Sequence, residues 1–143
     1  MGCHNLALVN ASADHVWRTL RNFHDLSWSA NVVESVTPVG DAGGTDLGAK
    51  RILNGAFHET LHALDDGAHY LKYSIDDGPG PVARDQVSGY FGEIRVMEVT
   101  VPAGGPRAAV MWTSHWAREN GGVQEFCDPI YKALLNDLVA HFT

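Results

Sequence analysis

Residues 123–142 read VQEFCDPIYKALLNDLVAHF and carry the longest helical pattern in the sequence. Apolar side chains recur there every four residues, at Phe126, Ile130, Leu134 and Leu138. This period predicts an amphipathic helix with one broad face against the rest of the protein. Pro129 could begin a helix capped by Asp128, or lie inside a helix that begins near Val123. We favour the longer, kinked helix, because the apolar stripe continues upstream to Phe126.

Upstream of this helix, apolar and polar residues alternate with the period of a β-strand. We predict strands over residues 4–9, 31–39, 49–53, 56–64, 69–75, 86–101 and 107–117. Asn54-Gly55 is a hairpin signal because both residues tolerate positive φ, and further turns are expected over 41–45, 65–67 and 102–106. The stretch 76–81 is rich in Gly and Pro and is not expected inside a strand. Short turns between strands predict an antiparallel meander.

Two short helices are expected between the first two strands. Ser12 is suited to cap a helix in which Val16, Trp17 and Leu20 share one face. A second short helix or turn is expected over residues 24–28. No repeat or linker divides the 143 residues, so we predict one α+β domain over 1–143.

Composition excludes several classes of partner. Hydrophobic residues make up 45% of the chain and the net charge is −7, so we expect no nucleic-acid partner. No apolar run approaches the roughly 20 residues of a membrane span, and we expect no membrane insertion. Cys3 and Cys127 are too few for a disulfide framework, which favours a cytoplasmic protein with reduced thiols. For the oligomeric state, the sequence is compatible with a monomer or a homodimer.

The order of strand, two short helices, six strands and long helix resembles the START-like or SRPBCC superfamily, which has the helix-grip fold. More narrowly, the chain resembles the bacterial polyketide cyclase/dehydrase and lipid-transport family. The resemblance rests on residues 13–20, Trp28, 48–51, 58–61, 64–66, 73–75, 89–90 and 110–114. It implies a curved antiparallel sheet of about seven strands around the C-terminal helix, with a pocket between them. Because this family is functionally diverse, the fold does not fix a reaction.

Strand alternation indicates which side chains should face that pocket. The predicted ligand-binding residues are Leu53, Phe57, Glu59, Leu61, Tyr73, Tyr90, Trp112, Phe126, Ile130 and Leu134. Such an apolar, aromatic lining with few polar groups is typical of small-molecule sites. The alternative is that these side chains fill one another and leave no cavity.

Glu59 is the polar exception on this apolar face. A buried carboxylate costs free energy unless it is paired, so Glu59 could anchor a ligand, act as a general base, or form an ion pair with Arg51 or Lys50. An ideal two-residue hairpin at Asn54-Gly55 would place Arg51 on the opposite face. A bulge or a longer turn would bring Arg51 and Glu59 together.

No cofactor or metal is expected. His58 and His62 lie about 13 Å apart on a strand, so they cannot share one ion, and no nucleotide-binding glycine motif is present.

We rank the binding of a hydrophobic lipid, polyketide or aromatic metabolite above catalysis, since polar groups are few. The alternatives are a cofactor-independent cyclase, aromatase or dehydratase and a pure interaction domain. Catalytic candidates would be Glu59, Tyr73, Tyr90 and His115, and His24 is a further acid/base candidate.

Overall fold

The computed structural model describes residues 1–101 and 104–143, so residues 102 and 103 of the expected turn lie outside the described residues. Seven strands form one curved antiparallel sheet, in the order β1-β8-β7-β5-β4-β3-β2. They are β1 (Gly2–Val9), β2 (Val36–Val39), β3 (Lys50–Leu53), β4 (Phe57–Asp65), β5 (Tyr70–Asp77), β7 (Phe91–Val99) and β8 (Arg107–His115). The predicted α+β fold with an antiparallel sheet is confirmed.

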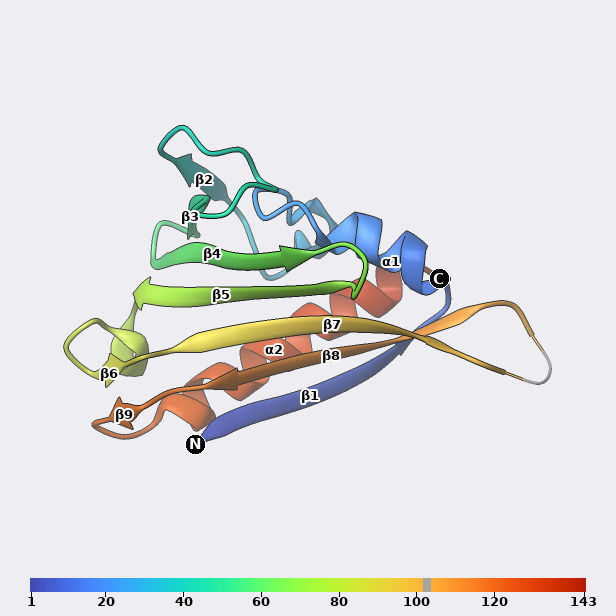
Figure 1. Cartoon of the computed structure of the whole chain (residues 1–143). Coiled ribbons are helices and arrows are strands. Elements are labelled where there is room, and N and C mark those ends of the chain that lie inside the picture. Colours follow the sequence, from blue (N-terminus) through green and yellow to red (C-terminus); the bar gives the residue numbers. More distant parts are fainter. Residues whose placement is uncertain (102–103) are drawn as a thin grey trace.

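Both α-helices lie where the sequence predicts them, whereas the short helix or turn expected over 24–28 is a 3-10 helix that begins only at Ser27. Helix α1 (Ala13–Leu20) begins after Ser12, whose hydroxyl accepts the His15 N–H at 3.1 Å. The 3-10 helix η1 (Ser27–Ser29) follows it. Helix α2 (Val123–His141) contains Pro129, which confirms the longer helix, and it runs along one face of the sheet (Figure 1). None of the helices in the described residues is long and apolar enough to cross a membrane.

Three strand predictions need correction. The segment 31–39 is a strand only over β2, and the long strand over 86–101 is broken at Gly89, whose φ of 64° turns the chain. The break leaves β6 (Val87–Ser88), which pairs with β9 (Arg118–Glu119) in a separate two-stranded sheet. Strand β5 extends through Asp76 and Asp77, because the Gly and Pro residues that end it begin only at residue 78. A 3-10 helix, η2 (Gly80–Val82), follows.

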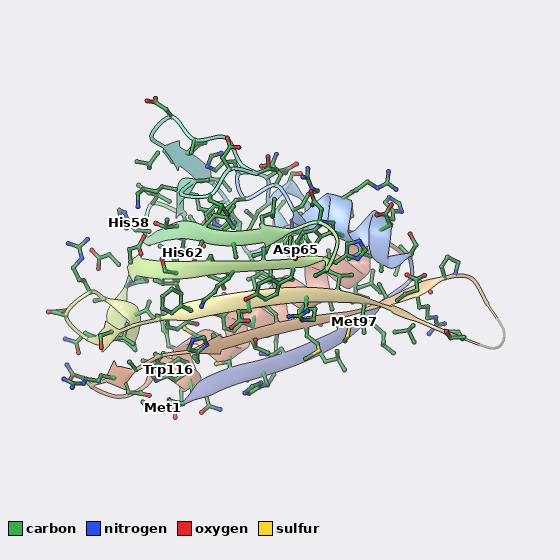
Figure 2. The ribbon with its side chains drawn as sticks, in the orientation of Figure 1. Met1, His58, His62, Asp65, Met97 and Trp116 are labelled. Carbon is green, nitrogen blue, oxygen red and sulfur yellow. The ribbon has the colours of Figure 1, made fainter. Side chains whose placement is uncertain are left out.

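The core lies between α2 and the concave face of the sheet. Its buried side chains come from β5, β7 and β8 and from the inner stripe of α2, and they include Leu71, Tyr73, Ile94, Val96, Val110, Trp112, Tyr131, Leu134, Leu135 and Leu138. On β4, His58 and His62 are exposed on the opposite face (Figure 2). This packing leaves the inner face of β3 to β5 and the inner stripe of α2 as the walls of the site.

Candidate functional site

A pocket lies between the sheet, helix α2 and the segment that links α1 to β2. The sheet contributes Arg51, Leu53, Phe57, Glu59, Tyr73, Ile75 and Trp112, with Asn54 from the turn after β3. Helix α2 contributes Cys127, Ile130, Tyr131 and Leu134. The segment after α1 contributes Leu26, Val32 and Val33. The wall is therefore mostly apolar, and its polar groups cluster on β3, β4, β5 and α2.

Seven of the predicted site residues meet in this pocket: Leu53, Phe57, Glu59, Tyr73, Trp112, Ile130 and Leu134. The other predicted residues lie just outside its lining. Leu61 is fully buried in the core, and Tyr90 lies behind Tyr131, to whose hydroxyl it is hydrogen-bonded. Phe126 stacks on Phe57 with ring centroids 6.3 Å apart, at the edge of the site.

Arg51 and Glu59 form a buried ion pair on neighbouring strands. The turn between β3 and β4 contains residues 54–56, one more than an ideal two-residue hairpin, so Arg51 lies directly opposite Glu59. The Arg51 Nε and Nη2 atoms lie 2.8 and 2.6 Å from Glu59 Oε1, and both side chains are less than a tenth exposed. The longer turn is therefore what places the pair on the inner face.

The remaining contacts of Arg51 fix its guanidinium in place. Its Nη1 donates to the Phe23 carbonyl at 2.8 Å, and the guanidinium carbon lies 3.7 Å from the Phe23 ring centroid. Burial raises the pKa of Glu59, and the positive charge and hydrogen bond of Arg51 oppose that shift. The pair is held by contacts on both sides, as a buried charge requires.

A chain of hydrogen-bonded aromatic side chains crosses the inner wall. The Trp112 indole N–H donates to the Tyr73 hydroxyl at 3.0 Å, and Tyr73 donates to Tyr131 at 3.3 Å. The Tyr131 hydroxyl is in turn bonded to that of Tyr90. Burial raises the pKa of Tyr73, Tyr90 and Tyr131, so all three are neutral phenols. Trp112 can only donate, which leaves the Tyr73 proton directed away from the indole.

The segment after α1 is a part of the site that sequence reasoning missed. Leu26, Val32 and Val33 line the pocket from backbone that is neither helix nor strand, although Val32 and Val33 fall in the strand predicted over 31–39. Because these two valines are adjacent, alternation does not indicate which of them faces inward. Asn54 ties this segment down. Its side chain accepts from the Glu34 backbone N–H at 2.7 Å and donates to the Val32 carbonyl at 2.9 Å. Asn54, which with Gly55 forms the hairpin signal, thus also closes one side of the pocket.

The pocket is small as it stands. Its free volume is about 50 Å³, which at about 15 Å³ per water holds roughly three water molecules. A larger ligand must therefore displace side chains. A second cavity of about 20 Å³ lies beyond Leu26, Arg51 and Trp112, which line both spaces. These three side chains separate the two cavities.

The remaining candidates for acid/base chemistry lie elsewhere. His115 is half exposed on the outer face of the sheet, where it stacks on Phe91. His24 bonds the Lys50 carbonyl at 2.9 Å outside the pocket lining. Burial raises the pKa of the Cys127 thiol to about 11, which leaves it protonated at neutral pH. Glu59, Tyr73 and Tyr131 are thus the remaining acid/base candidates that line the pocket.

A curved antiparallel sheet closed by a long C-terminal helix, with a lined pocket between them, defines a START-like, helix-grip protein. The chain belongs to the family described as polyketide cyclase / dehydrase and lipid transport, whose model matches residues 7–143.

Solved structures share the same fold. A protein from Nitrosospira multiformis is 35% identical, with a TM-score of 0.93 over 100% of this chain and 97% of the other. An uncharacterized protein from Bacillus thuringiensis is 23% identical, with a TM-score of 0.79 over 99% and 98% of the two chains. The protein XoxI from Bacillus cereus is also 23% identical, with a TM-score of 0.77 over 99% and 94%. A search of curated proteins returned no match.

Proposed function

We propose that this protein binds a hydrophobic small molecule, such as a lipid, polyketide or aromatic metabolite, in the pocket between the sheet and α2. The observation that carries the proposal is the composition of the lining. Apolar side chains from three separate parts of the chain surround free space, and the few polar groups come mainly from β3, β4, β5 and α2. Small-molecule sites combine an apolar enclosure with a few convergent polar groups in this way.

Access to the pocket requires movement, because the free volume is small. Phe57 and Ile130 both line the pocket and are only partly buried, so they lie between the interior and solvent. The segment carrying Val32 and Val33 has no strand or helix of its own, and a few turn hydrogen bonds and the Asn54 side chain hold it. Such a wall opens at a lower free-energy cost than a paired strand.

Binding can be tested with N-phenyl-1-naphthylamine, a neutral dye that fluoresces in apolar surroundings. Ile130→Trp fills the pocket from its rim, and we expect it to reduce dye binding at least about tenfold. Leu6→Trp makes a similar change on an exposed residue of β1 and should leave binding intact. Circular dichroism would verify that both variants fold. Equal dye binding by wild type and Ile130→Trp would contradict the proposal.

A second candidate is a cofactor-independent cyclase or dehydratase. Glu59 favours it, because a carboxylate whose pKa is raised by burial is suited to general base catalysis. With a polyketide-like substrate, Glu59→Gln should then lower turnover by about 10²–10⁴-fold while binding persists. No turnover by the wild-type protein, despite measurable substrate binding, would leave a binding function alone.

A further inference from the structure

The kind of ligand that the pocket can bind depends on which of its polar atoms are already hydrogen-bonded within the protein. Arg51 is the positive charge of the lining, and it contacts Glu59 Oε1, the Phe23 carbonyl and the Phe23 ring. Its Nε, Nη1 and Nη2 atoms each have an oxygen within 2.8 Å. The cation is therefore compensated within the protein.

Only one of the two carboxylate oxygens of Glu59 is hydrogen-bonded to the protein. Both close contacts from Arg51 go to Oε1, and none of the hydrogen bonds among the described residues involves Oε2. Oε2 is also not among the described side-chain atoms that are fully buried without a partner, so it keeps some accessible surface. Because Glu59 lines the pocket, that surface belongs to the pocket wall. The wall thus presents a carboxylate oxygen that can accept a hydrogen bond.

The same wall presents a donor. The Tyr73 oxygen accepts a hydrogen bond from Trp112, so the Tyr73 hydroxyl can donate its own hydrogen bond to another acceptor. Its present acceptor is the Tyr131 hydroxyl at 3.3 Å, which is a long hydrogen bond between two hydroxyl groups. A ligand oxygen in the pocket could replace Tyr131 as the acceptor at little cost. Glu59, Tyr73 and Tyr131 all line the same small space.

We infer that the polar group recognised at this site is a neutral hydroxyl, as in a phenol or an alcohol, and not a carboxylate. This inference rests on the proposed binding function. A hydroxyl can donate to Glu59 Oε2 and accept from Tyr73 in place of Tyr131, so it can bond to both groups at once. A carboxylate can accept from Tyr73 but would lie against Glu59, and two like charges in a buried site repel each other. Fatty acids and other anionic lipids are thereby disfavoured.

Three ring compounds of matched shape test this inference: p-cresol, p-toluate and p-xylene. At pH 7 the phenol is neutral and the carboxylic acid is ionised. Affinities can be measured by chemical-shift titration of the isotope-labelled wild-type protein, which also locates the binding site. We expect p-cresol to bind about tenfold more tightly than either of the others, because it alone satisfies both polar groups.

A variant pair then assigns the preference to Glu59. Glu59→Gln should bring the affinity of p-cresol within about threefold of that of p-xylene and should strengthen p-toluate binding. Glu34→Gln removes the same charge from an exposed side chain and should leave the order unchanged.

The outcomes separate the two proposals. If p-toluate binds most tightly, or all three compounds bind equally, the hydroxyl inference is wrong while the binding function stands. If none of them shifts resonances of the pocket and the neutral dye does not bind, both proposals fail. Because the wild-type series alone decides the inference, it stays falsifiable even if Glu59→Gln does not fold.

Discussion

Asp66 is an exposed carboxylate that ties the first helix to the hairpin between β4 and β5. Its Oδ1 accepts from the Trp17 indole at 2.8 Å and from Arg21 Nε at 2.9 Å, and its Oδ2 accepts from Arg21 Nη2 at 3.0 Å. Hydrogen bonds from Arg21 and Trp17 lower the pKa of Asp66. The ionised form is therefore the one that stabilises the fold.

Asp66→Asn should destabilise the protein at pH 7 by about 1 kcal/mol, at the upper end for exposed ion pairs because the arginine contact is bidentate. A lowered pKa contributes stability above the ordinary aspartate value, and this is lost as the pH falls through the folded-state pKa. The melting temperatures of wild type and variant should thus differ at pH 7 and converge in acid. Asp41→Asn, an equal charge change at another exposed residue, serves as the control. A gap that is independent of pH would contradict this account.

Arg51 and Glu59 illustrate what single residues reveal in sequence. Glu59 is recognisable because a carboxylate interrupts an apolar face, and that signal is local. Its pairing with Arg51 depends on the number of residues in the turn after Leu53, and Asn54-Gly55 suits turns of more than one length. The inward position of Glu59 was therefore predictable, whereas its pairing with Arg51 followed only from the strand register.

Helix α2 carries a proline well inside its length. Pro129 has no N–H, so the Glu125 carbonyl lacks its usual helical donor, and the Pro129 ring is exposed. The helix nonetheless continues from Val123 to His141, because its buried side chains hold it on the sheet. Tertiary packing here outweighs a local helix-breaking residue.

Pro129→Ala should raise the free energy of unfolding by about 1–2 kcal/mol, since it restores a helical donor while losing some of the stiffness that proline gives the unfolded chain. Chemical denaturation measured by circular dichroism would give the value. Asn136→Ala, at an exposed position of the same helix, should gain only about 0.5 kcal/mol from helix propensity. A loss of stability in Pro129→Ala would mean that the ring makes contacts that matter more than the missing hydrogen bond.

Some helices and strands can be predicted from their sequences better than others. Strands β4, β7 and β8 and helix α2 have a clear period and were predicted, apart from the ends. The two-residue strands β6 and β9 are too short to carry any period, and they exist because Gly89 turns the chain. The segment holding Leu26, Val32 and Val33 was predicted as a short helix or turn followed by a strand, and it forms neither at these three residues. One whole side of the pocket was for this reason invisible in the sequence.

The molecule as a whole divides the inner surface of α2 between core and pocket. Leu134 lines the pocket, whereas Leu138, one turn further on, is fully buried and lies outside the lining. A leucine in a closed core leaves a new cavity when it is truncated, but one beside existing free space has fewer contacts to lose. Truncating Leu134 and Leu138 therefore compares the same substitution beside the pocket and in the closed core of one helix.

Leu138→Ala should destabilise the protein by about 3–5 kcal/mol and Leu134→Ala by about 2–3 kcal/mol, the lower part of the range for leucine truncation. Leu134→Ala enlarges the existing pocket, so it should also strengthen p-xylene binding about three- to tenfold, as expected when more apolar surface can be buried. Denaturation curves and chemical-shift titrations would measure both effects, with the shifts at pocket residues identifying where p-xylene binds. If the two variants lose equal stability and neither changes p-xylene affinity, then Leu134 packs as ordinary core. The free space beside it would then have no role in ligand binding.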